Sequence, residues 1–279
     1  MKLSIIVINF NTQKLFEDCL RSVKKHLKIK DYEVIVVDNA SEKFNQSTVK
    51  KIIPGVQIIQ SKENLGFGRA NNLAAKQAKG EYLWFLNSDT LLNANNNIEV
   101  LIDYLDSHKN YAVVAPLVLD ASNIPQRYQF GYWPAVWRMV LEKPVNKRVA
   151  KNPNRAKHWK WLNADYLPMQ SRNVDWVSGA AMMVRKNVFN EVGGFESEYF
   201  LYYEDVDLCR KFWANKQKIR FIKEAQIIHL EGGSEVDMAK KKLIAYHSQD
   251  IYFKRWGSPV SRFVLHTIRR PYAKRWQKK

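Results

Sequence analysis

Two side chains that carry oxygen, Asn87 and Asp89, flank Ser88 directly after the apolar residues 82–86. A run this apolar is typical of a strand buried on both faces of a parallel sheet, and such sheets bind ligands at the carboxyl ends of their strands. Both side chains could then turn toward one hard divalent cation, which in proteins commonly also holds a diphosphate. The alternative is a plain polar turn, because Asn, Ser and Asp are common turn residues.

Polar residues follow three further apolar segments of the first half of the chain. The four polar ends are Asn9-Phe10-Asn11, Asp38-Asn39, Asn64-Leu65-Gly66 and Asn87-Ser88-Asp89. Because such ends meet at one edge of a parallel sheet, they predict a cradle for a nucleotide. Asp38 can accept a hydrogen bond from a ribose hydroxyl or a base N–H, and Asn71 can reach the same ligand from the following helix. For each residue alone, the commoner role is to cap the next helix.

An acidic cluster, Glu204, Asp205 and Asp207, begins a predicted helix, where the helix dipole favours carboxylates. Helical spacing puts Asp205 on the apolar face with Leu208 and Asp207 on the polar face with Arg210. We therefore expect Asp205 to face the core or a pocket, and Asp207 to face solvent. A carboxylate on an apolar face is costly without a partner or a role, so Asp205 is a candidate general base.

His229 closes the last predicted strand of the sheet. At the edge that holds Asp89 it could supply a nitrogen ligand to the same cation, which suits Mn²⁺ better than Ca²⁺. The neighbouring Gly232-Gly233-Ser234 loop could offer backbone N–H groups to a phosphate. The alternative is a structural histidine held by hydrogen bonds.

A competing motif, Gly66-Phe67-Gly68-Arg69-Ala70-Asn71, opens like the glycine-rich fingerprint of dinucleotide-binding proteins. It departs from that pattern at Asn71, where the fingerprint has Gly or Ala. It also follows the third strand rather than the first. A dehydrogenase is therefore not expected.

Strand-like and helix-like segments must alternate to position these residues. The first half predicts strands at 3–8, 32–37, 56–59 and 82–86, with helices at 13–26, from Gly68 to Ala78, and at 98–105. The second half predicts a strand at 175–184, helices at 186–192 and 204–214, and a strand at 219–228. We predict an irregular insertion for residues 126–172, which are rich in Trp, Pro, Lys and Arg. The pattern is that of an α/β fold with an open, mostly parallel sheet flanked by helices.

Composition narrows the class of protein and its partners. A chain of 279 residues with 46% hydrophobic and 26% charged residues can bury a core. The net charge of +18 attracts polyanions such as nucleic acid, acidic lipid surfaces or phosphorylated small molecules. Two distant cysteines, Cys19 and Cys209, indicate a reducing compartment. No segment has the length of a membrane span, so we expect a soluble or peripheral protein.

The chain has no acidic residue after Asp250, and the cations of this tail alternate with aromatic residues. This pattern suits the surface of an anionic bilayer, where each cation contributes about 1 kcal/mol. The alternative is a partly helical tail that packs on the rest of the protein. No nucleic-acid-binding motif or zinc module is present, so a nucleic acid is not expected as a partner.

Seven motifs in this order resemble family-2 glycosyltransferases of the GT-A fold, close to the bacterial rhamnosyltransferase-like branch. The resemblance covers residues 3–235 and lies in the order and spacing of the motifs. The motifs are Ser4-Ile5-Ile6-Val7-Ile8-Asn9-Phe10-Asn11, Val37-Asp38-Asn39-Ala40-Ser41, Asn64-Leu65-Gly66-Phe67, Leu86-Asn87-Ser88-Asp89, Trp176-Val177-Ser178-Gly179-Ala180, Gly193-Gly194-Phe195 and Tyr203-Glu204-Asp205-Val206-Asp207-Leu208.

The resemblance implies an inverting transfer of a sugar from a nucleotide-sugar donor to an acceptor hydroxyl. It implies Asp205 as catalytic base beside Glu204, a Mn²⁺ or Mg²⁺ site at Asn87, Asp89 and His229, and acceptor contacts at Trp176, Ser178 and Gly179. Asn87 departs from the family, which has Asp there, so the ion affinity without nucleotide is expected to be lower. The implied donor-binding residues are Asn9, Phe10, Asn11, Asp38, Asn64, Gly66, Asn71, Asn87, Ser88 and Asp89.

The family branch favours dTDP-rhamnose as donor, with UDP-sugars as the alternative, and a glycan or polyprenyl-diphosphate-linked glycan as acceptor in cell-surface polysaccharide synthesis. We expect a GT-A domain at 1–235, with a nucleotide-sugar half at 1–118 and an acceptor half at 119–235, then a basic extension at 236–279. The expected location is the inner face of the cell membrane, as a peripheral protein. The competing hypothesis is a non-catalytic polyanion-binding protein on the same scaffold.

Overall fold

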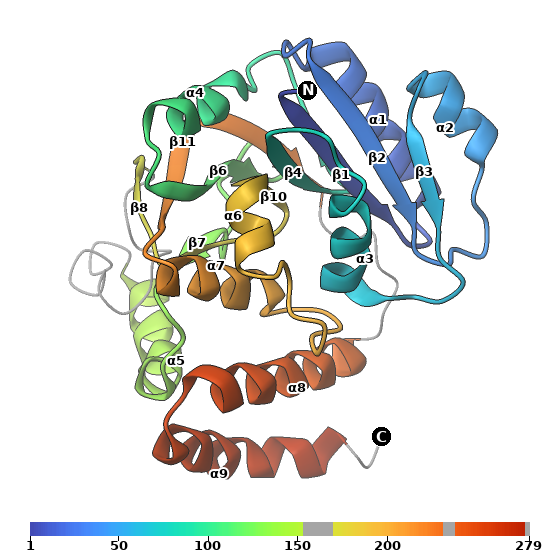
Figure 1. Cartoon of the computed structure of the whole chain (residues 1–279). Helices are drawn as coiled ribbons and strands as arrows, with labels where there is room; N and C mark the ends of the chain where they lie inside the picture. Colours follow the sequence, from blue (N-terminus) through green and yellow to red (C-terminus); the bar gives the residue numbers. More distant parts are fainter. Residues whose placement is uncertain (153–169, 231–237, 277–279) are drawn as a thin grey trace.

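A computed structural model describes residues 1–152, 170–230 and 238–276 (Figure 1). A nine-stranded sheet forms its centre, in the order β3-β2-β1-β4-β10-β6-β11-β5, with β8 paired to β11. Its strands are β1 Leu3–Asn9, β2 Tyr32–Asp38, β3 Gln57–Gln60, β4 Tyr82–Asn87, β5 Thr90–Leu91, β6 Tyr111–Leu119, β8 Arg172–Asn173, β10 Ala181–Arg185 and β11 Lys218–His229. A separate pair joins β7 Phe130–Gly131 to β9 Trp176–Val177.

Strand directions bring distant polar ends to one edge of the sheet. β1 pairs in parallel with β2 and β4, and β2 with β3. β10 runs antiparallel to both β4 and β6, and β6 is parallel to β11. Two reversals restore the direction, so β11 ends at the same edge as β4. The predicted mostly parallel sheet is confirmed.

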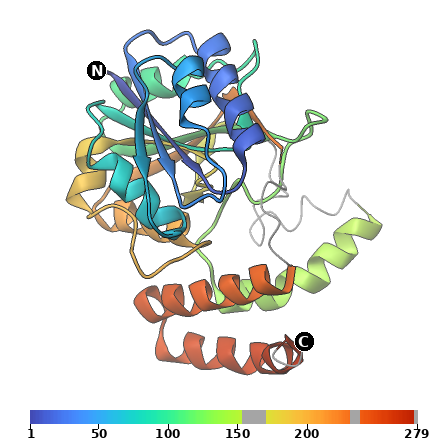
Figure 2. The same cartoon turned by 90° about the vertical axis from the view of Figure 1, so that its right-hand side faces the viewer.

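Alternation along the strands gives the sheet two apolar faces. Ile5 and Val7 pack in one core with α1, α2 and α4, whereas Ile6 packs in a second core with α3, α6 and α7. Figures 1 and 2 show the resulting three layers. The helices are α1 Gln13–His26, α2 Gln46–Ile52, α3 Gly66–Ala75, α4 Glu99–Ser107, α6 Lys186–Glu191 and α7 Glu204–Ala214.

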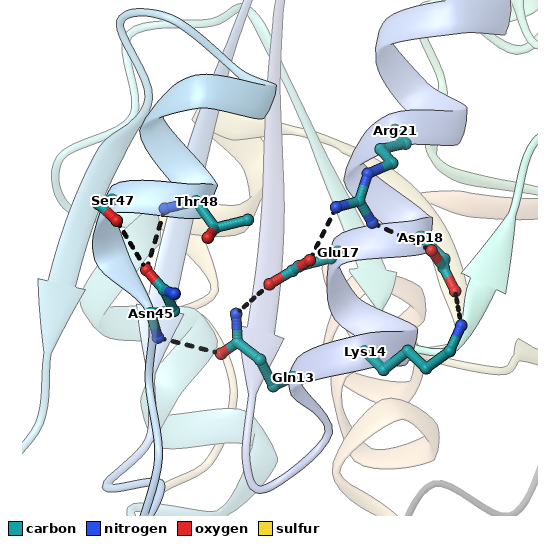
Figure 3. Close-up of polar contacts among 8 residues, drawn as sticks. All are labelled: Gln13, Lys14, Glu17, Asp18, Arg21, Asn45, Ser47 and Thr48. Carbon is teal, nitrogen blue, oxygen red and sulfur yellow. Dashed lines mark hydrogen bonds and ion pairs between the residues drawn. The ribbon is translucent and has the colours of Figure 1, made fainter.

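Side-chain contacts fix α1 against the start of α2 (Figure 3). Gln13 donates from Nε2 to Glu17 Oε1 at 2.7 Å and accepts the Asn45 N–H at 3.3 Å. Asn45 in turn caps α2, because its Oδ1 accepts the Thr48 N–H at 3.1 Å. These contacts hold the loop that follows β2, and the polar end of β2 belongs to that loop.

A further layer of helices lies beyond α7. It consists of α5 Val136–Lys151, α8 Met238–Trp256 and α9 Pro259–Trp276, and Figure 2 shows α8 and α9 as an antiparallel pair with α5 beside it. An apolar cluster that includes Val206, Ile251 and Leu265 joins α7 to α8 and α9. The tail therefore packs on the rest of the protein through this cluster. Within the described ranges, no helix is long and apolar enough to cross a membrane.

Three expectations about the elements were wrong. Residues 126–172 are not uniformly irregular, because α5 occupies 136–151; its sequence has no one-sided apolar pattern and contains Pro144. The strand expected at 175–184 is two strands, β9 and β10, which belong to different sheets and are separated by residues 178–180. The buried central strand β6 was not predicted. Its apolar run shows no alternation, so periodicity gives no signal there.

Candidate active site

The ends of β1 and β2 meet as a buried polar pair. Asn9 and Asp38 are register partners, and Asn9 Nδ2 donates to Asp38 Oδ1 at 3.0 Å. Their side chains are almost fully buried. Thr12 extends the pair toward β4, because its hydroxyl donates to Asn9 Oδ1 at 3.0 Å and lies 2.9 Å from the Ser88 hydroxyl. The predicted convergence of these strand ends is therefore observed.

The loop from β3 to α3 is joined to the end of β2 by Asn39. Its Nδ2 donates to Asn64 Oδ1 at 2.9 Å, and its Oδ1 accepts the Leu65 N–H at 2.8 Å. Gly66 has a φ of +75°, and a Cβ there would lie 2.1 Å from the Phe200 carbonyl oxygen. The positive φ and the close Phe200 carbonyl therefore explain the glycine at this position, independently of the predicted donor contact.

Asn71 and Phe10 differ in their exposure to solvent. Asn71 is buried, and its Nδ2 donates to the Phe67 carbonyl at 3.0 Å. No described residue donates to its buried Oδ1, so this acceptor is available to a ligand. Phe10 is exposed, as is Asn11, whose Oδ1 accepts the Glu42 N–H at 2.9 Å.

The three predicted metal ligands lie together at the ends of β4 and β11. His229 Nε2 is 3.0 Å from Asp89 Oδ1 and 3.4 Å from Asn87 Nδ2. The other ring nitrogen, Nδ1, lies 3.0 Å from Gln126 Oε1, which can only accept. Nδ1 therefore carries the proton in the neutral ring, and the Nε2 lone pair points toward the Asp89 carboxylate. Two electron-rich atoms at this distance require a cation or a proton near them.

The donor set of this cluster fits a divalent cation. A nitrogen and a carboxylate oxygen as neighbouring ligands of an octahedral ion are about 3 Å apart, because each lies about 2.1 Å from the metal. The Gln126 contact orients His229 as an outer partner does in metal sites. One carboxylate, one imidazole and one amide is a sparse set, and the described residues contain no group of three or more His, Cys, Asp or Glu side chains that could hold a metal ion. The remaining ligands would have to come from a diphosphate or water.

The start of α7 holds two neighbouring carboxyl groups. Asp205 Oδ2 accepts the Gly179 N–H at 2.9 Å, and its Oδ1 accepts the Val206 N–H at 2.8 Å. Burial raises the pKa of Asp205, and these backbone donors oppose that rise. Glu204 is 4% exposed, and no described residue hydrogen-bonds to its buried Oε2. Burial, followed by the charge of Asp205, raises the pKa of Glu204 well above its usual value.

The backbone before α7 is strained. Tyr202 and Tyr203 have φ values of 71° and 68°, in the left-handed region that non-glycine residues avoid. Two such residues in succession cost of order 1–3 kcal/mol each, and strain of this kind clusters at functional sites. It sets the direction in which Glu204 and Asp205 leave the loop.

The expected direction of Asp207 was wrong. Its side chain is fully buried, and its Oδ1 accepts from Tyr199 at 3.2 Å, from Arg255 Nε at 3.0 Å and from Trp256 Nε1 at 2.6 Å. Helical spacing shows one helix alone, and it cannot reveal that α8 covers the second face of α7. Asp207 therefore joins α7 to α8.

The predicted acceptor residues lie in the connection from β9 to β10. Gly179 contacts Asp205 through its N–H, and a Cβ there would lie 3.0 Å from the Phe67 ring. Ser178 donates its N–H to the Gln129 carbonyl at 2.9 Å. Trp176 donates from Nε1 to the Tyr132 carbonyl at 2.9 Å and packs partly buried among apolar side chains. Gly179 is thus the member of this set closest to the candidate base.

Sequence reasoning missed Thr12 and Gln126. Thr12 directly follows the polar end of β1, so its position was a usable signal. Gln126 begins the segment that was expected to be irregular, and nothing in its surroundings indicates the two hydrogen bonds to His229. The Gly232-Gly233-Ser234 loop lies outside the described residues.

Comparison with known proteins gives one family and several relatives. Residues 4–193 match the family described as "Glycosyl transferase family 2". The N-acetylglucosaminyl-diphospho-decaprenol L-rhamnosyltransferase of Mycobacterium tuberculosis is 26% identical over 238 residues, which are 79% of this chain and 73% of that protein. Rhamnosyltransferase WbbL of Escherichia coli strain K12 is 25% identical over 222 residues, 76% of this chain and 79% of its own.

A solved structure shares the fold. The mannosyltransferase PcManGT from Pyrobaculum calidifontis, in complex with GDP-Man and Mn²⁺, superimposes with a TM-score of 0.63 and 15% identity over 95% of this chain and 68% of its own. The GT-A architecture expected from the sequence is therefore confirmed.

Proposed function

The chain belongs to glycosyl transferase family 2, and we propose that it moves a sugar from a nucleotide-sugar donor to a hydroxyl of a lipid-linked glycan. The observation that carries the proposal is a backbone link between two groups with opposite tasks: the Asn87 N–H donates to the Ala180 carbonyl, and the neighbouring Gly179 N–H donates to Asp205. The Asp89 and His229 pair suits a cation that holds a diphosphate, and Asp205 suits a base. Nothing described supports the non-catalytic alternative.

Asn9, Asp38 and Asn71 are proposed to bind the nucleoside. Asn9 and Asp38 support this role because they are buried and polar at the carboxyl edge of the sheet. The free Oδ1 of Asn71 adds an acceptor for a hydroxyl or N–H of the ligand. Phe10, Asn11, Asn64, Gly66 and Ser88 complete the proposed donor-binding set.

Asp89, His229 and Asn87 are proposed to hold Mn²⁺ or Mg²⁺. A cation bound there would stabilise the negative charge that develops on the departing diphosphate. The relative in complex with GDP-Man and Mn²⁺ supports a divalent ion in this fold. Asn87 brings no charge, so we propose that the nucleotide diphosphate contributes to ion binding.

Asp205 is proposed as the base that takes the proton from the acceptor hydroxyl. Both of its oxygens accept backbone N–H groups, which fixes the carboxylate, and its raised pKa brings its basicity closer to neutral pH. Burial and then the charge of Asp205 raise the pKa of Glu204 well above its usual value, which favours a protonated Glu204 beside a charged Asp205. The hydroxyl attacks the anomeric carbon as the diphosphate leaves, and a single displacement inverts that centre.

The acceptor is proposed to be a polyprenyl-diphosphate-linked glycan, and the donor dTDP-rhamnose or, as the alternative, a UDP-sugar. The Mycobacterium tuberculosis relative, named for a diphospho-decaprenol acceptor, supports the acceptor, and both relatives, named rhamnosyltransferases, support rhamnose as the sugar. Trp176, Ser178 and Gly179 are proposed to contact the acceptor sugar. We further propose a catalytic domain at 1–235, with donor and acceptor halves at 1–118 and 119–235. The extension at 236–279 would hold the protein at the inner face of the membrane.

A transfer assay tests this function. The protein is incubated with Mn²⁺ and dTDP-rhamnose or a UDP-sugar, together with N-acetylglucosaminyl-diphospho-polyprenol. Glycosylated lipid and nucleoside diphosphate should then appear in equal amounts, with the anomeric configuration of the sugar inverted. Release of nucleoside diphosphate without glycosylated lipid would refute the acceptor, and no release from any donor would refute the function.

A further inference from the structure

A cavity of about 700 Å³ lies between α5, α7 and the α8–α9 hairpin. Its volume falls in the range of small-molecule sites, about 300–1,000 Å³. Residues of α5, α8 and α9 line the cavity, and Figure 2 shows α5 beside the pair formed by α8 and α9. None of the proposed donor or metal residues lines it.

The wall of the cavity is apolar and partly open. Trp137 and Val140 of α5 and Val260 of α9 line it, and they are 49%, 48% and 71% exposed. Large apolar side chains gathered in one concave surface indicate an apolar ligand, because water contact there is costly.

One end of the cavity is polar and cationic. Arg210 lies there, with its guanidinium carbon 4.8 Å from the centre of the Trp133 ring and 5.6 Å from that of Trp256. No carboxylate of the described residues forms an ion pair with Arg210. Tyr252 also lines the cavity and is 1% exposed; burial raises the pKa of its hydroxyl, and Arg210 opposes that rise through its charge and a hydrogen bond. A guanidinium and a phenol hydroxyl side by side in one wall can both donate to a phosphate oxygen.

The polar end also contacts the segment that leads to the candidate base. The rings of Tyr252 and Tyr203 are 5.5 Å apart between centres, and Tyr203 directly precedes Glu204. Arg210 belongs to the same helix as Asp205. A ligand that reaches Tyr252 from the cavity would therefore lie beside Tyr203, the residue that precedes the start of α7.

We propose that this cavity binds the polyprenyl chain of the acceptor, with the acceptor diphosphate at Arg210 and Tyr252. The chain lies against Trp137, Val140 and Val260, and the head group points toward α7. The inference rests on the proposed function, because the occupant is the lipid end of the proposed acceptor. The positive charge of the protein, +18, complements a diphosphate.

Direct binding of farnesyl diphosphate tests the site without catalysis. Calorimetry should give a Kd at least tenfold lower for farnesyl diphosphate than for inorganic diphosphate or farnesol, because the cavity recognises both ends. Val140→Glu and Val260→Glu should each raise this Kd at least tenfold. Phe263→Glu is the matched control, since Phe263 lies on α9, is 74% exposed and does not line the cavity.

The cationic end has its own pair of variants. Arg210→Gln should weaken the binding of farnesyl diphosphate and leave the binding of farnesol unchanged. Lys254→Gln, which removes an exposed cation of α8 outside the cavity, should change neither. Equal weakening by both variants would assign the effect to general charge and overturn the head-group assignment.

Three results would overturn the proposal. The first is a Kd for farnesyl diphosphate no lower than that for inorganic diphosphate. The second is an unchanged Kd in Val140→Glu and Val260→Glu, and the third is an equal loss of affinity in Phe263→Glu. If the two variants weaken binding to phosphatidylglycerol vesicles but not to farnesyl diphosphate, the cavity is a membrane-docking surface and the proposal is wrong. Nucleoside diphosphates should stabilise these variants as much as the wild type. This stabilisation tests the proposed function separately from the cavity.

Discussion

His229 Nε2 lies 3.0 Å from Asp89 Oδ1, and Asp89 lies in the turn between β4 and β5. The pair forms because β5 runs antiparallel to β11, with Thr90, the residue after Asp89, as the register partner of His229. The Leu230 N–H donates to the Asp89 carbonyl at 2.9 Å, which fixes the two chain segments together. The backbone contact therefore keeps the two side chains close together.

Asn87→Asp should strengthen binding of Mn²⁺ without nucleotide. The variant adds a carboxylate beside His229, and ion affinity rises with the charge of the ligand set. We expect at least a tenfold lower Kd, about 1.4 kcal/mol, by calorimetry of the free protein. Asn95→Asp is the control, because it adds the same charge on an exposed loop and should leave the Kd unchanged. An unaltered Kd in Asn87→Asp would argue against a metal at this position.

Asp205→Asn should abolish transfer and preserve donor binding. General base catalysis contributes about 10²–10⁴-fold, so kcat should fall by that factor while the Kd of the nucleoside diphosphate stays the same. The exposed Asp103→Asn on α4 is the control and should retain full activity. Normal turnover in Asp205→Asn would remove Asp205 from the mechanism.

Glu204→Gln should stabilise the protein at alkaline pH. The raised pKa of Glu204 means that the folded chain keeps a proton that the unfolded chain releases above its ordinary value of 4.5. Stability of the wild type therefore falls as the pH rises above that value, until the folded carboxyl also ionises. Gln cannot ionise, so the variant should have the higher Tm at pH 8.

The difference in Tm should shrink as the pH approaches 4.5, where both states of the wild type bind the proton. Thermal melts from pH 4.5 to 8 measure it, with the exposed Glu42→Gln as control. A constant difference across this range would mean that Glu204 does not hold a raised pKa.

Asp207→Ala should destabilise the protein and loosen the α8–α9 hairpin. The variant leaves the Arg255, Trp256 and Tyr199 donors without their shared acceptor, which costs about 3 kcal/mol in urea unfolding. Asp207→Asn keeps an oxygen in place and should cost less. A loss below about 1 kcal/mol in Asp207→Ala would show that the apolar cluster alone holds α8 to α7.

Local patterns in the sequence predicted the parts of the fold that depend on one element. Helices α1 and α7 begin and end where the apolar spacing indicates, because each packs an apolar stripe on the sheet. The strand-end cradle was also predictable, since parallel strands share an edge. The same reasoning put Asp207 in solvent, because contacts from a distant helix leave no periodic trace.

The remaining parts depend on contacts between distant segments. Gln126 orients His229 across the sheet edge, and α5 gains its burial from a separate hairpin rather than from a stripe of its own. The apolar cavity arises only where α5, α7 and the hairpin meet. Such features follow from tertiary packing and were therefore not predicted.

The most direct test of the account is the thermal stability of the protein with nucleoside diphosphates, with and without Mn²⁺. Ligand at 100 times its Kd stabilises the folded state by about 2.7 kcal/mol. We predict a rise in Tm with dTDP or UDP that grows when Mn²⁺ is added, and loss of the added Mn²⁺ effect in Asp89→Asn. No rise with any nucleoside diphosphate, with or without the ion, would contradict the central claim that this edge of the sheet binds a nucleotide-sugar.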